Sequence, residues 1–210
     1  MRMSATDYAR ARRLLVKRDP VIANLIRAHG ACGLAQVQHT DPFKALCHAI
    51  IAQQLSTKAA ATIERRFQAL FSPHPPTPAA VAAIADDRLR AVGLSTQKLR
   101  YMRDLCARVQ DGSLVLDRLD TMPDDQVIAT LTAVKGIGRW TAEMFLMFRL
   151  HRPDVLPVGD LGIVKAVQRA YRLRKAPTAD RLTKLGESWR PYRSVACWYL
   201  WASLDNKGTP

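Results

Sequence analysis

Two glycines and an aspartate stand out between residues 131 and 160, which read LTAVKGIGRWTAEMFLMFRLHRPDVLPVGD. Gly136 and Gly138 lie in a short turn between two stretches of helical periodicity, and glycine adopts the left-handed or strained angles that such turns use. The unpaired N–H groups and positive dipole end of the following helix suit a phosphate. Asp160 opens the next helical stretch, where a fixed carboxylate can stabilise positive charge or orient water.

Both features also have ordinary structural explanations. A glycine cap ends many helices, and an aspartate at a helix start is a common N-cap. Lys135 and Arg139 flank the turn and favour phosphate binding, while Ile137 between the glycines is expected to anchor the turn in the core. The two roles of Asp160 are compatible, because a capping carboxylate is held in place.

The composition favours a polyanionic partner. Of the 210 residues, 32 are Lys or Arg and 18 are Asp or Glu, so the formal charge is +14 and the pI about 10.2. A surplus of this size predicts nucleic acid as the first class of partner and an anionic membrane surface as the second. The hydrophobic content of 48% is enough for a substantial core.

The sequence predicts a soluble, monomeric, intracellular protein of the cytoplasm or nucleoid. No apolar run reaches the roughly 18–20 residues of a membrane span. Residues 1–20 are basic but lack the apolar core of a secretory signal. The spacing of Tyr8, Ala11 and Leu15 predicts an amphipathic helix there, although a targeting role for this basic segment stays open.

The cysteines are too scattered for a metal or redox centre. There is no C-x-x-C pair among the four, which predicts buried reduced thiols. They are Cys32, Cys47, Cys106 and Cys197.

Helical periodicity dominates the chain, and strand-like alternation is scarce. Pro123, Asp124 and Asp125 suit the first turn of a helix. We expect an all-α fold of about nine or ten helices with short connections. The clearest apolar stripes are Phe43, Leu46, Cys47, Ile50 and Ile51; Val127, Ile128, Leu131 and Val134; and Val195, Trp198, Tyr199 and Ala202.

Four stretches between about residue 15 and residue 204 form a recognisable set. They are RDPVIANLIRAHG, DPFKALCHAIIAQQLSTKAA, the hairpin LTAVKGIGRWTA with LPVGDLGIVK, and WRPYRSVACWYLW. In this order they resemble the helix-hairpin-helix (HhH-GPD) superfamily of DNA base-excision glycosylases, and most closely its DNA-3-methyladenine glycosylase II branch. The resemblance implies two helical lobes with a DNA-binding cleft between them and no N-terminal β domain. One lobe would combine residues 1–40 with 151–210, and the other would be residues 41–150 with the hairpin at 135–139.

The resemblance also implies a reaction. Asp160 matches the catalytic aspartate of the family, which acts on a damaged base flipped out of double-stranded DNA. By the same resemblance, family members that also cut the strand have a lysine directly after the Gly-x-Gly-Arg of the hairpin, and this lysine forms a Schiff base with the sugar. In this chain the residue at that place is Trp140, which cannot form a Schiff base. We therefore expect water as the nucleophile and an abasic site as the product. Glu143 and Asp154 are the nearest other carboxylates, and both are expected at the surface.

The resemblance assigns further residues to the base and to the DNA. Trp140 and Trp201 match aromatic positions of the alkylpurine pocket, with Gln53 also at the substrate. Met144 stands where the resembled branch has a tyrosine, so the preferred base stays open. The segment containing Gln54 is expected to meet the minor groove, although both glutamines also suit an ordinary helix end, and which residue is the intercalating wedge stays open. The remaining DNA-binding candidates are Ser56, which also suits a helix cap, and Lys135, Gly136, Ile137, Gly138, Arg139 and Thr141.

No cofactor is expected, although a monovalent cation in the hairpin stays possible. Iron–sulfur members of the family carry four clustered cysteines near the C-terminus, where this chain has only Cys197. The alternatives to an alkylpurine glycosylase are a non-catalytic helix-hairpin-helix module that binds DNA or RNA, a glycosylase for another damaged base, and a bifunctional lyase.

Overall fold

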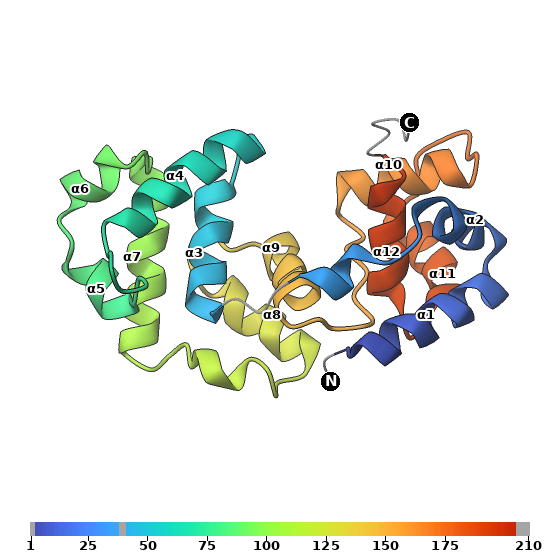
Figure 1. The fold of residues 1–210 in the computed structure, drawn as a ribbon, viewed down its shortest axis with the longest axis horizontal. Coiled ribbons are helices and arrows are strands. Elements are labelled where there is room, and N and C mark those ends of the chain that lie inside the picture. The colour runs from blue at the N-terminus through green and yellow to red at the C-terminus, as the bar shows by residue number, and fades with distance from the viewer. Residues whose placement is uncertain (1–2, 38–40, 205–210) are drawn as a thin grey trace. The chain divides into compact units, whose positions relative to one another are not determined.

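The computed structural model describes residues 3–37 and 41–204, and these ranges contain helices and no β-strand (Figure 1). The all-α fold class is therefore confirmed. The described residues form twelve α-helices rather than nine or ten, together with three 3-10 helices and a π-helical turn. The count is higher because α5 (Pro78–Ala83) and α6 (Asp86–Ala91) have six residues each, which is too short to show a period of 3.6.

The chain divides into two compact units. One combines Met1–Gln38 with Leu146–Pro210, and the other is His39–Phe145. The resemblance predicts boundaries after residues 40 and 150, and the observed division is after residues 38 and 145.

Helix α12 (Arg193–Ala202) is the core of the first unit. It packs against α1 (Ala5–Arg18), α2 (Pro20–His29) and α10 (Leu161–Ala170), and Figure 1 shows it running through the middle of this unit. The apolar stripe expected in this helix is buried at Val195 and Tyr199. The shorter elements of the unit are η1 (Gly33–Gln36), α11 (Ala179–Gly186) and η4 (Glu187–Trp189).

One buried carboxylate connects three elements of this unit. Asp19, which is 6% exposed, caps α2 by accepting from the N–H groups of Val21 (2.9 Å) and Ile22 (3.1 Å). Its second oxygen accepts from Tyr171 Oη (2.5 Å) and Trp189 Nε1 (2.9 Å). Burial, followed by the hydrogen bond and charge of Asp19, raises the pKa of Tyr171 above its ordinary value. Tyr171 is therefore a neutral donor, and Asp19 joins α2 to the segments after α10 and α11.

Helix α7 (Thr96–Gln110) is central to the second unit. It packs against α3 (Pro42–Ala52), α5 and α6, while α4 (Thr57–Ala69) packs on α3 and α8 (Asp124–Thr132) packs on α9 (Arg139–Met144). Between α7 and α8 lies η2 (Leu116–Arg118). The stripe expected in α3 is fully buried, namely Phe43, Leu46, Cys47, Ile50 and Ile51.

All four cysteines are buried. Burial raises the pKa of Cys32 and Cys106 to about 11 and that of Cys47 well above its ordinary value. These three thiols are therefore protonated at neutral pH. Throughout the described ranges, no helix is both long and apolar enough to cross a membrane.

The Asp19 arrangement predicts a large effect on stability. We expect Asp19→Ala to lower the free energy of unfolding by about 3 kcal/mol, because α2 loses its cap and two buried donors lose their acceptor. Urea denaturation measures this loss. Asp7→Ala is the control, since Asp7 belongs to an exposed capping box of α1 and its loss should cost less. Equal losses for the two variants would contradict the structural role of Asp19.

Candidate functional site

The turn between α8 and α9 uses its two glycines differently. Helix α8 ends at Thr132, earlier than the expected position near Lys135, and α9 begins at Arg139 as expected. Gly136 has a φ of +80°, and a Cβ there would lie 2.1 Å from Cδ2 of Tyr101. Gly138 has a φ of −88°, and a Cβ there would meet nothing within 4 Å. The expectation that both glycines use left-handed or strained angles is therefore wrong for Gly138, whose backbone any residue can adopt.

The hairpin presents positive charge and a helix start. Ile137 is 3% exposed and anchors the turn in the core, as expected. Gly138 is the N-cap of α9, and no side chain caps this helix. The side chains of Lys135 and Arg139 are each 71% exposed. An uncapped helix start beside two exposed cations is suited to an anion.

The segment after α3 meets this hairpin within the same unit. Gln53 Nε2 donates to the carbonyl of Gly136 at 2.7 Å. Gln54 is exposed and has a φ of 56°, an uncommon conformation for a residue with a side chain. Ser56 accepts from the N–H of Ala59 at 3.3 Å and caps α4, which confirms its structural role.

Helix α9 places its residues in contrasting environments. Trp140 is 51% exposed, Met144 is half-buried and Thr141 is buried. Glu143 is only 4% exposed and accepts from Arg139 Nε at 3.0 Å, so its expected place at the surface is wrong. Sequence reasoning missed this burial because a helical glutamate is usually exposed unless it is paired.

Asp160 is a buried and firmly held carboxylate in the first unit. It is 8% exposed and caps α10, where its Oδ1 accepts from the N–H of Ile163 at 2.7 Å. The same oxygen accepts from Trp201 Nε1 at 2.9 Å. The ring of Trp201 stacks on Phe148, with centroids 5.9 Å apart and planes at 26°. The structure thus brings together the predicted catalytic aspartate and one predicted aromatic residue of the pocket.

Gly162 and Leu161, which adjoin Asp160, and Phe148, which stacks on Trp201, were not among the predicted site residues. A Cβ on Gly162 would lie 2.9 Å from Asp160 Oδ1 and 3.1 Å from Trp201 Cδ1, so only glycine leaves room for this hydrogen bond. Leu161 is 83% exposed beside the buried carboxylate. A glycine in the first turn of a helix was the available signal for Gly162, but the stacking of Phe148 on Trp201 had no local signal.

Asp154 is held by two arginines rather than lying free at the surface. Its side chain is 22% exposed and accepts from Arg190 Nη1 at 2.8 Å and from Arg193 Nε at 2.7 Å. Asp154 therefore stays partly exposed, in keeping with the expected surface position, but its carboxylate is paired. Arg193 begins α12, so Asp154 joins the preceding loop to this central helix.

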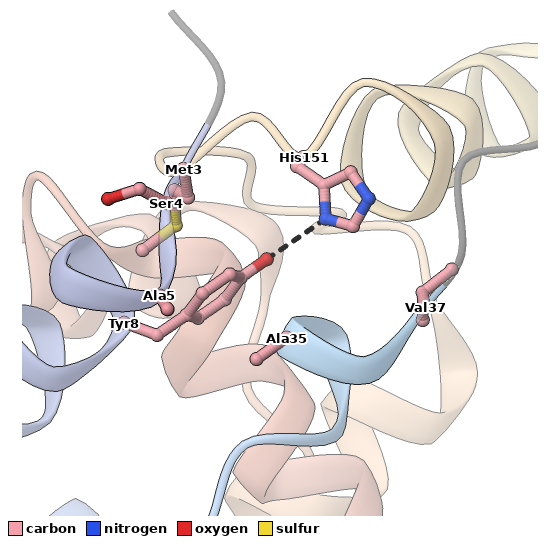
Figure 2. Close-up of a pocket in the computed structure, with 7 residues that line it drawn as sticks. All are labelled: Met3, Ser4, Ala5, Tyr8, Ala35, Val37 and His151. Atoms are coloured by element: carbon pink, nitrogen blue, oxygen red, sulfur yellow. Dashed lines mark hydrogen bonds between the residues drawn. The ribbon is translucent and has the colours of Figure 1, made fainter.

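A cavity of about 400 Å³ lies in the first unit, and none of the predicted site residues lines it (Figure 2). At its polar side, Tyr8 Oη lies 3.1 Å from His151 Nδ1. The other lining residues are Met3, Ser4, Ala5, Ala35 and Val37. Elsewhere in the described residues, no cluster of three or more His, Cys, Asp or Glu is arranged to hold a metal ion.

Comparison with known proteins agrees with these features. The model of the HhH-GPD superfamily of base excision DNA repair proteins matches residues 47–191. The chain belongs to this superfamily. DNA-3-methyladenine glycosylase 1 of Schizosaccharomyces pombe is 34% identical to it over 167 residues, which are 79% of this chain and 73% of that protein.

Solved structures of this superfamily share the fold. A DNA-3-methyladenine glycosidase from Bacillus halodurans has a TM-score of 0.81 and 36% identity, covering 92% of this chain and 88% of that one. A 3-methyladenine DNA glycosylase of Schizosaccharomyces pombe, solved in complex with abasic DNA, has a TM-score of 0.84 and 31% identity. Its match covers 96% of this chain and 100% of that one.

The different roles of the hairpin glycines predict different stabilities. We expect Gly136→Ala to lower the free energy of unfolding by about 2 kcal/mol, because the side chain meets Tyr101 and the left-handed backbone becomes strained. Gly138→Ala should change it by less than about 0.5 kcal/mol, since its backbone and surroundings accept a methyl group. Thermal denaturation of both variants tests this, and similar losses would contradict the structure of the turn.

Proposed function

We propose that this chain is a monofunctional DNA glycosylase that hydrolyses the N-glycosidic bond of alkylated purines of the 3-methyladenine type. Its substrate is double-stranded DNA, and its product is an abasic site. The observation that carries the proposal is the buried Asp160 carboxylate, oriented by Ile163 N–H and Trp201 Nε1, in a chain of a base excision repair superfamily. The names of the relatives support the class of damaged base.

Asp160 would act on the sugar as the base departs. Breaking the glycosidic bond builds positive charge on the sugar, and a fixed carboxylate stabilises that charge and orients a water molecule. The two hydrogen bonds to Oδ1 hold the group in place before the reaction, so little reorganisation is needed. An alkylated purine of this type is already cationic while attached to the sugar, so it takes the electrons of the broken bond and departs as a neutral base without strong acid assistance. One carboxylate therefore suffices.

Aromatic side chains would receive the flipped base. Trp201, stacked on Phe148, lies against the carboxylate, and Trp140 is 51% exposed. An indole face attracts a cationic base by about 1–2 kcal/mol when water is excluded. Met144 and Gln53 are the other proposed substrate contacts.

The hairpin would hold the DNA backbone. Its uncapped helix start and its two exposed cations support phosphate contacts that do not depend on base sequence. Within this segment we assign the contacts to Lys135, Gly136, Ile137, Gly138, Arg139 and Thr141, with Gln54 and Ser56 after α3 meeting the DNA beside the lesion.

Replacing the catalytic carboxylate tests the proposal. We expect Asp160→Asn to slow base release at least about a hundredfold while duplex affinity stays within about twofold, because charge stabilisation acts in the transition state. Free base is measured from duplexes with 3-methyladenine, 1-methyladenine, hypoxanthine or uracil. Asp154→Asn is the matched control, since Asp154 is also a partly buried carboxylate of this unit.

The same experiment separates the alternative functions. An absence of free base from the unaltered chain, with DNA binding intact, would favour a non-catalytic module. Release of hypoxanthine or uracil alone would identify another damaged base. Borohydride should trap no covalent adduct with the product, because Trp140 cannot form a Schiff base, and an adduct would identify a lyase.

The open surroundings of Gly138 allow a test of the hairpin that leaves the fold intact. We expect Gly138→Val to weaken binding to duplexes of any sequence by about tenfold, because its side chain blocks close approach of a phosphate to the backbone. Fluorescence anisotropy at moderate salt measures the affinity. Ala61→Val, at an exposed position of α4, is the control. Unchanged affinity of Gly138→Val would remove the hairpin from the DNA interface.

A further inference from the structure

Four side chains of α7 lie three, three and four residues apart, which places them along one face of the helix. They are Lys98, Tyr101, Asp104 and Arg108. All four lie in the same unit as the hairpin and the segment after α3. None of them belongs to the proposed DNA-contacting or catalytic residues.

Asp104 accepts a hydrogen bond from the start of the hairpin. Its Oδ2 accepts from the backbone N–H of Lys135 at 2.9 Å and from Arg108 Nε at 2.8 Å. Lys135 lies beyond the end of α8, so its N–H is bound by a carboxylate of another helix rather than by the helix itself. The Lys135 ammonium lies 3.7 Å from Asp104 Oδ1, but its side chain is 71% exposed, so this ion pair is weak.

The electrostatics of Asp104 agree with a permanent contact. Partial burial alone would raise the pKa of its carboxyl, but the N–H of Lys135 and the hydrogen bond and charge of Arg108 lower it below its ordinary value. The group is therefore an anion at neutral pH, and a charged acceptor makes a stronger hydrogen bond than a neutral one.

Tyr101 supports the next residue of the turn. Its ring lies where a Cβ of Gly136 would be, so the backbone of Gly136 rests directly on the ring. Gln97, one turn earlier on α7, donates to Tyr101 Oη at 2.5 Å and holds the ring. The shape of the turn therefore depends on its packing against Tyr101 of α7 as well as on Gly136.

The same face of α7 also holds the segment after α3. Lys98 Nζ donates to the carbonyl of Ile51 at 2.7 Å, near the end of α3. Gln53 then donates to the carbonyl of Gly136 at 2.7 Å. These bonds connect both proposed DNA-contacting segments to α7 and to each other.

We propose that Asp104 is a positioning residue for DNA binding, which fixes the hairpin on α7 through its hydrogen bond to the Lys135 N–H. This inference rests on the proposed function, because the hairpin is there assigned to the DNA backbone. Asp104 itself touches no DNA. Its loss frees the start of the turn, so that the helix start and its flanking cations no longer face the phosphates in one arrangement.

The direction in which DNA affinity changes when Asp104 is removed distinguishes a positioning role from a purely electrostatic one. Removing a carboxylate near a phosphate-binding segment strengthens DNA binding if charge alone matters. A positioning role predicts that removing Asp104 weakens DNA binding. Asp86 provides the matched control, because it is also a carboxylate of this unit paired with an arginine of α7, Arg103, and contacts neither the hairpin nor the segment after α3.

The affinities of Asp104→Ala, Asp104→Asn and Asp86→Ala for an undamaged duplex test the inference by fluorescence anisotropy. We expect Asp104→Ala to bind about tenfold more weakly, the ratio that one hydrogen bond to a charged group supplies. Asp104→Asn, which keeps an acceptor oxygen, should recover part of this loss. Asp86→Ala should bind as the unaltered chain does or slightly more tightly. With a damaged duplex, KM should rise by the same factor in Asp104→Ala while kcat stays within about twofold.

Affinity of Asp104→Ala equal to or above that of Asp86→Ala overturns the inference and leaves the proposed function intact. A fall in kcat at unchanged KM overturns it as well. Should Asp104→Ala not fold, as judged by its melting curve, the comparison is made between Asp104→Asn and Asp86→Asn, with the same order of affinities expected. Absence of duplex binding by the unaltered chain instead overturns the proposed function, and this inference with it.

Discussion

A buried carboxylate is stable only where donors replace the water it has lost, and this constraint organises the surroundings of Asp160. The N-terminus of α10 supplies one donor and Trp201 supplies another, both to the same oxygen. Gly162 leaves the space in which the indole approaches. The stacking of Phe148 then holds the indole. Each of these features follows from keeping one anion buried and oriented, which is also what charge stabilisation in a reaction requires.

Other acidic residues of the chain meet the same constraint with a structural result. Asp19 accepts from two backbone N–H groups and from Tyr171 and Trp189, and thereby joins helices. Glu143 and Asp154 are compensated by arginines. In the second unit, Asp104 accepts hydrogen bonds from Arg108 and from the backbone N–H of Lys135 in the hairpin. Burial of a carboxylate therefore does not mark a catalytic group by itself, even where an indole N–H is one of its donors. What distinguishes Asp160 is the resemblance of its segment to the one that carries the catalytic aspartate of the family.

Local patterns predicted much of this molecule. The apolar stripe of α3, the beginning of α9 at Arg139, the caps of α4 by Ser56 and of α10 by Asp160, and the anchoring of Ile137 all appear as expected. These features depend on residues within one or two turns of each other, because helical periodicity and capping are local. The order of four motifs also predicted the superfamily, which the comparisons show.

The contacts that build the site were decided by the tertiary structure. Trp201 reaches Asp160 across 41 positions of the sequence, and Asp104 reaches Lys135 across 31. The burial of Glu143 and the approach of Tyr101 to Gly136 likewise depend on packing between helices. The sequence by itself determined most of the helical segments, several of their first residues and which residue types are available for chemistry. Only the folded chain decided which of those residues meet, because burial and side-chain contacts arise from elements that are distant in sequence.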